Sequence, residues 1–250
     1  MSADLVSASV IRNGHAILKD ANLSCRPAAF TALCGPNGAG KTTALSVMTG
    51  ALEPEEGSAL LEGENVRNVS RIALARRRAV VSQTSQLGFP FQVHEVVAMG
   101  RAPHHGSPAQ ARDDFIIGAA LEAMDLLPFA ERNYLTLSGG ERQRVNIARA
   151  LSQIWDPPEA GGARWLFLDE PTSALDLKYQ IALMKRLKVL AQDGWGIVAV
   201  LHDLQLVKEH ADDVVLFKGG EIAIAGNANE ILSPERIQAI FDLEAPYALA

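Results

Sequence analysis

One glycine-rich run in this chain has the spacing of a phosphate-binding loop. Residues 35–42 read Gly-Pro-Asn-Gly-Ala-Gly-Lys-Thr and fit the pattern G-x-x-x-x-G-K-[ST], between an apolar strand-like segment at 30–34 and a helical pattern at 43–48. Glycines let successive backbone N–H groups curl around phosphate oxygens, and the following helix N-terminus adds unsatisfied donors and a positive dipole. The residues expected to contact phosphate are Gly35, Pro36, Asn37, Gly38, Ala39, Gly40, Lys41, Thr42 and Thr43.

Two side chains of this loop have distinct expected roles. Lys41 has the length and the charge to reach the β and γ phosphates of a nucleotide, and the Thr42 hydroxyl can ligate Mg²⁺. Mg²⁺ is therefore the expected cofactor. The sequence lacks the N-K-x-D element that would select guanine, so ATP is the expected nucleotide.

A second group of candidates lies far along the chain. Residues 165–168 form an apolar run that delivers two carboxylates, Asp169 and Glu170, at its end. In an open α/β sheet, ligands bind at the carboxyl ends of the strands, so both carboxylates are expected beside the phosphate loop. Asp169 would hold Mg²⁺ through its water shell, and Glu170 would act as the general base, or would position the water, for attack on the γ phosphate.

Strand-like and helical patterns alternate along the chain in the way that typifies an α/β fold with a largely parallel sheet. The prediction is a P-loop NTPase core of the RecA type, formed by residues 1–84 and 153–250. A helical subdomain is inserted at 85–152, where apolar residues recur at helical spacing. The predicted strands are 30–34, 79–82, 165–168, 196–201 and 214–217, followed by a hairpin to 221–225.

Composition sets the broad class of protein. The 250 residues are 48% hydrophobic and 21% charged with a formal net charge of −6, so a domain with a buried core is expected and a nucleic-acid partner is not. No apolar run approaches the ~18 residues that span a bilayer, and the N-terminus lacks the pattern of a secretory signal. We therefore expect a cytoplasmic protein. Cys25 and Cys34 form no CxxC pair, which argues against a structural zinc and a disulfide scaffold.

Residues 137–141, Leu-Ser-Gly-Gly-Glu, open a helical pattern between the phosphate loop and Asp169. A serine and glycines at a helix start present a hydroxyl and backbone donors, which makes this a second phosphate-binding element. In this order of motifs the chain resembles the ATP-binding cassette (ABC) family, whose members usually have Gln at the position of Glu141. The resemblance covers about residues 5–241 and implies an ABC nucleotide-binding domain with ATPase activity. It also implies a head-to-tail homodimer, in which the ATP held by one subunit meets Ser138, Gly139, Gly140 and Glu141 of the other.

Three further positions match the family. Gln83 follows a predicted strand and resembles the loop glutamine that senses Mg²⁺ and the attacking water. Asp176 ends a Ser-Ala-Leu-Asp segment that resembles the one contacting the opposite subunit beside the nucleotide. His202 follows the strand at 196–201 and resembles the histidine that contacts the γ phosphate. The implied catalytic set is Glu170, Gln83, His202 and Lys41, and the implied metal set is Thr42, Gln83 and Asp169.

One position departs from the family. ABC proteins commonly stack adenine on an aromatic residue in an early strand and turn, and the alignment puts Arg12 there, with Asn13 and His15 nearby. No aromatic residue occurs before Phe30. Because a guanidinium plane can also stack on a π-face, Arg12 is the expected contact for the base.

Several features favour an importer. The cassette stands alone, and residues 83–104 resemble the same segment of importers of iron chelates, haem and cobalamin. In that segment, Leu87, Phe89 and Phe91 form a small apolar patch suited to packing under the helical lobe or against a partner. Ser138 and Asp169 lie 31 positions apart, several more than is usual, and the extra loop at 155–164 looks like that of the ATP-binding subunits of bacterial haemin importers.

The resemblance thus implies an ATP-hydrolysing motor subunit for haem import. It would work with two permease subunits and, indirectly, a periplasmic substrate-binding protein, at the cytoplasmic face of the inner membrane. Import of a ferric siderophore or of cobalamin is the alternative, and a soluble non-transport ABC ATPase, such as an iron-sulfur assembly factor, is the second alternative. His104 and His105 could suggest a metal or haem ligand, but Gly106 and Pro108 follow them and favour a solvated loop.

Overall fold

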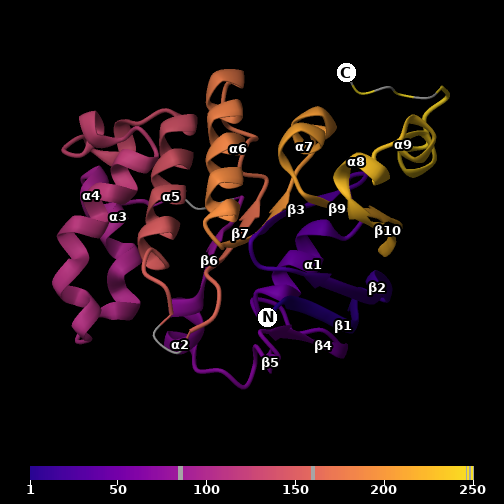
Figure 1. The fold of residues 1–250 in the computed structure, drawn as a ribbon, viewed down its shortest axis with the longest axis horizontal. Helices are drawn as coiled ribbons and strands as arrows, with labels where there is room; N and C mark the ends of the chain where they lie inside the picture. Colours follow the sequence, from indigo (N-terminus) through magenta and orange to yellow (C-terminus); the bar gives the residue numbers. More distant parts are fainter. Residues whose placement is uncertain (84–86, 159–160, 246, 248, 250) are drawn as a thin grey trace.

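The computed structural model describes residues 1–83, 87–158, 161–245, 247 and 249. Figure 1 shows two sheets beside a group of helices. Within the described residues, the larger sheet has six strands in the order β10-β9-β3-β8-β7-β6, and the smaller has four in the order β2-β1-β4-β5.

The larger sheet is parallel except at one edge. Strands β9, β3, β8, β7 and β6 pair in parallel, and β10 pairs with β9 in the antiparallel direction. Strands β3, β7 and β8 are buried along their whole lengths, as expected for parallel strands covered on both faces. The strands predicted from the sequence are therefore confirmed, with the bounds β3 Ala29–Cys34, β6 Arg78–Val81, β7 Trp165–Asp169, β8 Gly196–Val200, β9 Asp213–Lys218 and β10 Glu221–Asn227.

The smaller sheet is antiparallel and was not predicted from the sequence. Its strands are β1 Ala3–Arg12, β2 His15–Cys25, β4 Glu56–Leu61 and β5 Glu64–Asn65. In β1 the pairing register shifts between Leu5 and Ala8 and again between Ala8 and Val10. Such bulges interrupt the two-residue alternation of apolar and polar side chains, which is the sequence signal for a half-buried strand.

Helix α1 (Lys41–Met48) lies between the two sheets (Figure 1). Its Leu45 and Met48 belong to one hydrophobic core with Leu33 of β3 and Leu61 of β4. The phosphate loop precedes α1 directly, so it is anchored where both sheets meet.

The opposite face of the larger sheet is covered by α6 (Leu177–Gln192) and α7 (Leu204–His210), as Figure 1 shows. Leu183 and Leu187 of α6 pack in a second core with Phe30 and Ile197 of the sheet. The chain then continues through α8 (Ala228–Ile231) and α9 (Pro234–Phe241).

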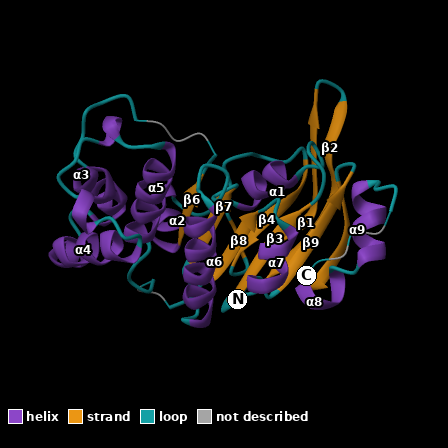
Figure 2. Cartoon of the chain, turned by 90° about the horizontal axis from the view of Figure 1, so that it is seen from above, coloured by secondary structure: helices purple, strands orange, loops and turns teal. Residues whose placement is uncertain are grey.

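The remaining helices gather at the end of the molecule away from α9 (Figure 2). The predicted boundary of this helical subdomain, between 84 and 85, lies outside the described residues. Helix α2 links the helical subdomain to the sheets.

No described helix combines the length and the hydrophobicity needed to cross a bilayer. The bounds are α2 Arg71–Arg77, α3 Val93–Ala98, η1 Met99–His104, η2 Pro108–Arg112, α4 Asp113–Ala123, η3 Leu127–Phe129, η4 Tyr134–Thr136 and α5 Gly139–Gln153, where η marks a 3₁₀ helix.

Candidate functional site

The glycine-rich loop curls tightly between β3 and α1. Gly35 has φ +143°, and a Cβ there would lie 2.3 Å from the carbonyl oxygen of Phe217. Gly40 has φ +99°, and a Cβ there would lie 2.7 Å from the carbonyl oxygen of Ile17. Only glycine permits both the backbone conformation and the close approach, so the spacing of these residues follows from the shape of the loop.

Lys41 is held in the mouth of the loop. Its side-chain ammonium donates to the carbonyls of Gly35 and Pro36, both at 2.8 Å, and the residue is only 6% exposed. Burial lowers the pKa of this ammonium. A phosphate oxygen would offer the buried charge a stronger acceptor than the two carbonyls. The adjoining cavity of about 170 Å³ is lined by residues 37–43 together with Ile17 and Glu170.

Thr42 and Asp169 form the oxygen pair predicted for a metal. The Thr42 hydroxyl donates to Oδ1 of Asp169 at 2.9 Å. Burial raises the pKa of the Asp169 carboxyl, so its charged form lies in an unfavourable environment. A hydroxyl beside a buried carboxylate fits Mg²⁺, which prefers oxygen ligands and would offset the cost of burying the negative charge.

Glu170 lies at the centre of a second cluster. Its Oε2 accepts a hydrogen bond from the Gln83 amide at 2.7 Å, and its Oε1 lies 2.8 Å from Nε2 of His202. These three residues follow or end the neighbouring strands β6, β7 and β8, whose carboxyl ends share one edge of the sheet. Glu170 also has φ +49°, a strained conformation for a non-glycine residue that costs about 1–3 kcal/mol and often marks a functional site.

Ser138 caps α5 and exchanges hydrogen bonds with Glu141. The Ser138 hydroxyl accepts from the Glu141 N–H at 3.2 Å, and the Glu141 carboxylate accepts from the Ser138 N–H at 2.6 Å. The latter bond holds the pKa of Glu141 low. Glutamate and glutamine both complete such a capping box, which explains why this chain can carry Glu141. Arg132 lies 3.5 Å from the carboxylate and offsets its charge.

The start of α5 faces the segment that ends in Asp176. A Cβ on Gly140 would lie 3.1 Å from the carbonyl oxygen of Ala174, and Asp176 caps α6 by accepting from the Tyr179 N–H at 3.1 Å. Ser138, Gly139, Gly140, Glu141 and Asp176 line a cavity of about 390 Å³. This cavity shares no lining residue with the one at the phosphate loop. The two segments predicted to bind phosphate therefore line separate cavities within one chain.

The structure does not bring Arg12 into the cavity at the phosphate loop. Arg12 is exposed at the end of β1, opposite His15, and Ile17 is the residue of this hairpin that lines the cavity. Ile17 is absent from the sequence-based prediction. The alternation along β2 could not have found it, because the pairing register between β1 and β2 shifts between Val10 and Ile11, opposite Ile17.

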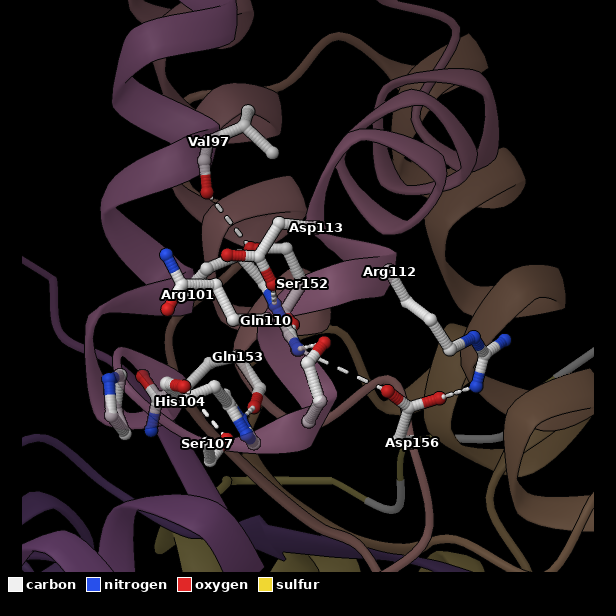
Figure 3. A network of polar contacts seen from close by, with 12 residues as sticks. Val97, Arg101, His104, Ser107, Gln110, Arg112, Asp113, Ser152, Gln153 and Asp156 are labelled. Carbon is white, nitrogen blue, oxygen red and sulfur yellow. Dashed lines mark hydrogen bonds and ion pairs between the residues drawn. The ribbon is translucent and has the colours of Figure 1, made fainter.

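Two remaining expectations have different outcomes. His104 is 7% exposed, with Nε2 2.8 Å from the Gln153 carbonyl oxygen, so the expectation of a solvated loop is wrong for this residue (Figure 3). The backbone carbonyl gives the buried ring a hydrogen-bond partner, so the ring needs no metal ligand role to be buried.

In the apolar segment, Leu87 and Phe91 pack against the core, while Phe89 remains 68% exposed.

Comparison with known proteins identifies the family. The sequence profile of the ABC transporter family matches residues 18–173, over the phosphate loop, the start of α5 and Glu170. The chain belongs to the ABC transporter family. As a member it is an ATPase.

Curated ABC relatives match over nearly the whole chain. The hemin import ATP-binding protein HmuV of Rhizobium meliloti (strain 1021) is 41% identical over 234 residues, covering 93% of this chain and 88% of the relative. HmuV of Pseudomonas aeruginosa (strain PAO1) is 43% identical over 236 residues, covering 94% and 91%. A solved dimeric ATP-binding cassette in a post-hydrolysis state, bound to ADP and Pi, has a TM-score of 0.78 at 25% identity, covering 91% of this chain and 99% of that one.

We expect Glu170→Gln to abolish ATP turnover while leaving ATP binding intact, because the amide cannot accept the proton of water. A general base typically contributes about 10² to 10⁴ in rate. Steady-state phosphate release and equilibrium binding of ATP measure the two effects separately. Glu209→Gln is the matched control, since Glu209 also accepts a glutamine amide at 2.7 Å but lies outside the cluster. Wild-type turnover in Glu170→Gln would remove Glu170 from the role of base.

We expect Ile17→Ala to weaken ATP binding about fivefold, because truncation removes roughly 1 kcal/mol of apolar contact. Ile11→Ala is the control: Ile11 belongs to the same hairpin and is 50% exposed, but it does not line the cavity. Inorganic tripolyphosphate, which lacks a base, should compete equally well in both variants. Equal ATP affinity for the two variants would show that Ile17 does not contact the nucleotide.

Proposed function

We propose that this protein is the ATP-hydrolysing subunit of a bacterial importer whose cargo is haem. The observation that carries the enzymatic part is the contact of Gln83 and His202 with Glu170, beside the cavity that contains Lys41. The hemin import ATP-binding proteins that match this chain at 41% and 43% identity support haem as the cargo. They match over 93% and 94% of the chain rather than at the nucleotide site alone.

The proposed chemistry is attack of water on the γ phosphorus of ATP, with the bond to the β–γ bridging oxygen breaking to give ADP and phosphate. Lys41 and the loop N–H groups hold the β and γ phosphates. Thr42 and Asp169 would hold Mg²⁺, which when bound supplies positive charge against the charge that develops on the phosphoryl oxygens. Glu170 accepts the proton of the attacking water or orients it.

Gln83 and His202 have supporting roles in this proposal. Both contact the Glu170 carboxylate, at 2.7 Å and 2.8 Å. They therefore hold the catalytic carboxylate in one orientation. When ATP is bound, the Gln83 amide would also meet Mg²⁺ and the attacking water, and the His202 imidazole would meet the γ phosphate. We propose that Arg12 and Ile17 together contact the adenine ring of ATP.

The active form is proposed to be a head-to-tail homodimer. The cavity at Lys41 and the cavity at Ser138 are separate within one chain, so each can serve the nucleotide of a different subunit. Ser138, Gly139, Gly140 and Glu141 would then close on the γ phosphate of the partner's ATP, and Asp176 would contact the partner beside it. Hydrolysis removes the phosphate that joins the two surfaces, so the dimer reopens.

The remaining partners follow from the importer proposal. Two permease subunits would receive the movement of the dimer, and exposed Phe89 offers them an apolar contact. A periplasmic substrate-binding protein would act indirectly, through the permease. The chain would then work at the cytoplasmic face of the inner membrane as a peripheral subunit.

Mixing two inactive variants tests the shared site. We expect Lys41→Ala and Ser138→Arg subunits to be inactive alone and to regain activity together, because one composite site of the heterodimer keeps an intact phosphate loop and an intact Ser138. Independent sites would give about half of the wild-type rate per heterodimer. Phosphate release measured after demonstrated subunit exchange is the readout. If mixing restores no phosphate release, the site is not one that is shared between two chains and functions independently.

The cargo is tested in proteoliposomes that contain this subunit with its permease. We expect a haem-loaded substrate-binding protein to stimulate ATP hydrolysis, and Glu170→Gln to abolish haem uptake. A ferric siderophore and cobalamin, each with its own binding protein, are the matched controls. Stimulation by one of these in place of haem would correct the cargo, and the absence of any stimulated uptake would favour an ABC ATPase without a transport role.

A further inference from the structure

Both ends of α5 are held by contacts with distant parts of the chain. Its N-terminal end carries Ser138, and its C-terminal end contacts Arg101 of η1, which is only 3% exposed. Arg101 donates from Nε to Asp113 at 2.8 Å and from Nη1 to the carbonyl of Ser152 at 2.7 Å. One buried guanidinium thus joins the start of α4 to the last turn of α5 (Figure 3).

The loop that follows α5 extends this network to the large sheet. Asp156 pairs with Arg112 and lies 3.9 Å from Nη2 of Arg101, as Figure 3 shows. Arg164, at the other end of the loop, donates to the carbonyls of Trp155 at 2.8 Å and of Asp193 at 3.2 Å. Since Asp193 ends α6, the loop is bound to the helical subdomain at one end and to the core at the other.

The same loop also meets the smaller sheet. Glu62, in the turn between β4 and β5, accepts from the Ala163 N–H at 2.6 Å. Gly162 has φ +106°, and a Cβ there would lie 2.3 Å from the Glu62 carboxylate, so only glycine permits this contact. We call the described parts of this loop, Trp155–Pro158 and Gly161–Arg164, the brace.

Helix α2 completes the anchorage. The side-chain amide of Gln153, the last residue of α5, donates to the carbonyls of Ala75 and Arg78, both at 2.8 Å. Carbonyls at the end of a helix lack partners within it, so this amide satisfies groups that would otherwise be unpaired. Arg76 adds a bond to the carbonyl of Pro103 at 2.8 Å. The C-terminal end of α5 is therefore fixed against the start of β6, the strand that leads to the catalytic cluster.

We propose that the brace and Arg101 set the direction of α5, and that Asp156 and Arg101 are positioning residues for the closure of Ser138 on the partner's nucleotide. This proposal rests on the proposed function. Ser138 lies about 22 Å from the C-terminal end of α5, so a tilt of the helix by about 5° about that end would move Ser138 by about 2 Å. A displacement of that size exceeds the tolerance of a hydrogen bond to phosphate. The extra loop seen in the sequence would thus act on the nucleotide from the far end of a helix.

Subunit mixing separates this role from general damage to the fold. Asp156→Asn keeps the shape of the side chain and removes its charge. Mixed with Lys41→Ala, the variant supplies the phosphate loop while the partner supplies a braced Ser138, so activity should match that of the Ser138→Arg and Lys41→Ala mixture. Mixed with Ser138→Arg, it must supply Ser138 itself, and activity should fall about tenfold or more, as expected for a misplacement of an ångström or more.

Asp114→Asn is the matched control, because Asp114 is exposed in the first turn of α4 beside Asp113 and should give equal rates in both mixtures. Arg112→Gln changes an exposed partner of Asp156 and should give the same difference in rate between the two mixtures, but a smaller one. This second variant keeps the proposal testable if Asp156→Asn does not fold. ATP affinity of the separate subunits should stay unchanged. If Asp156→Asn has the same rate in its two mixtures, and Arg112→Gln has the same rate in its two, the proposed role of the brace is wrong while the proposed function stands. Failure of the reference mixture would overturn the proposed function and the brace together.

Discussion

The parallel pairing of β6, β7 and β8 is the constraint on which the proposed site depends. Parallel neighbours end at the same edge of a sheet, so Gln83, Glu170 and His202 meet although 119 positions separate the first from the last. The strands can pair in this way because both faces of the sheet are covered, by α1 on one side and by α6 and α7 on the other. The contacts of Glu170 are therefore a consequence of core packing as much as of local sequence.

The phosphate loop depends on the same arrangement. A Cβ on Gly35 or Gly40 would collide with backbone of β9 or β2, so the loop is shaped by strands from both sheets. The hydrogen bond from Thr42 to Asp169 then ties the start of α1 to the end of β7. A nucleotide at Lys41 would thus contact a rigid surface, whereas Ser138 is carried on a helix whose direction is set elsewhere.

Much of this could be predicted from the sequence because the signals are local. Continuous apolar runs identify buried parallel strands, and the spacing of Gly35, Gly40 and Lys41 identifies the loop. The antiparallel sheet escaped prediction because bulges in β1 break its alternation. The contribution of Ile17 depends on which face of a hairpin turns toward the loop, and the burial of His104 depends on the carbonyl of Gln153, 49 positions away. Such long-range contacts leave no pattern in a single sequence.

The central claim is that each ATP is bound between two copies of the chain, with Lys41 of one and Ser138 of the other on the same phosphate. A crystal structure of Glu170→Gln with ATP and Mg²⁺ tests this most directly, because the variant should hold the substrate without turnover. The account predicts two nucleotides per dimer, each γ phosphate within hydrogen-bond distance of Lys41 from one subunit and of the start of α5 from its partner. A nucleotide bound by a single chain, with Ser138 of that chain or of no chain beside it, would contradict the account.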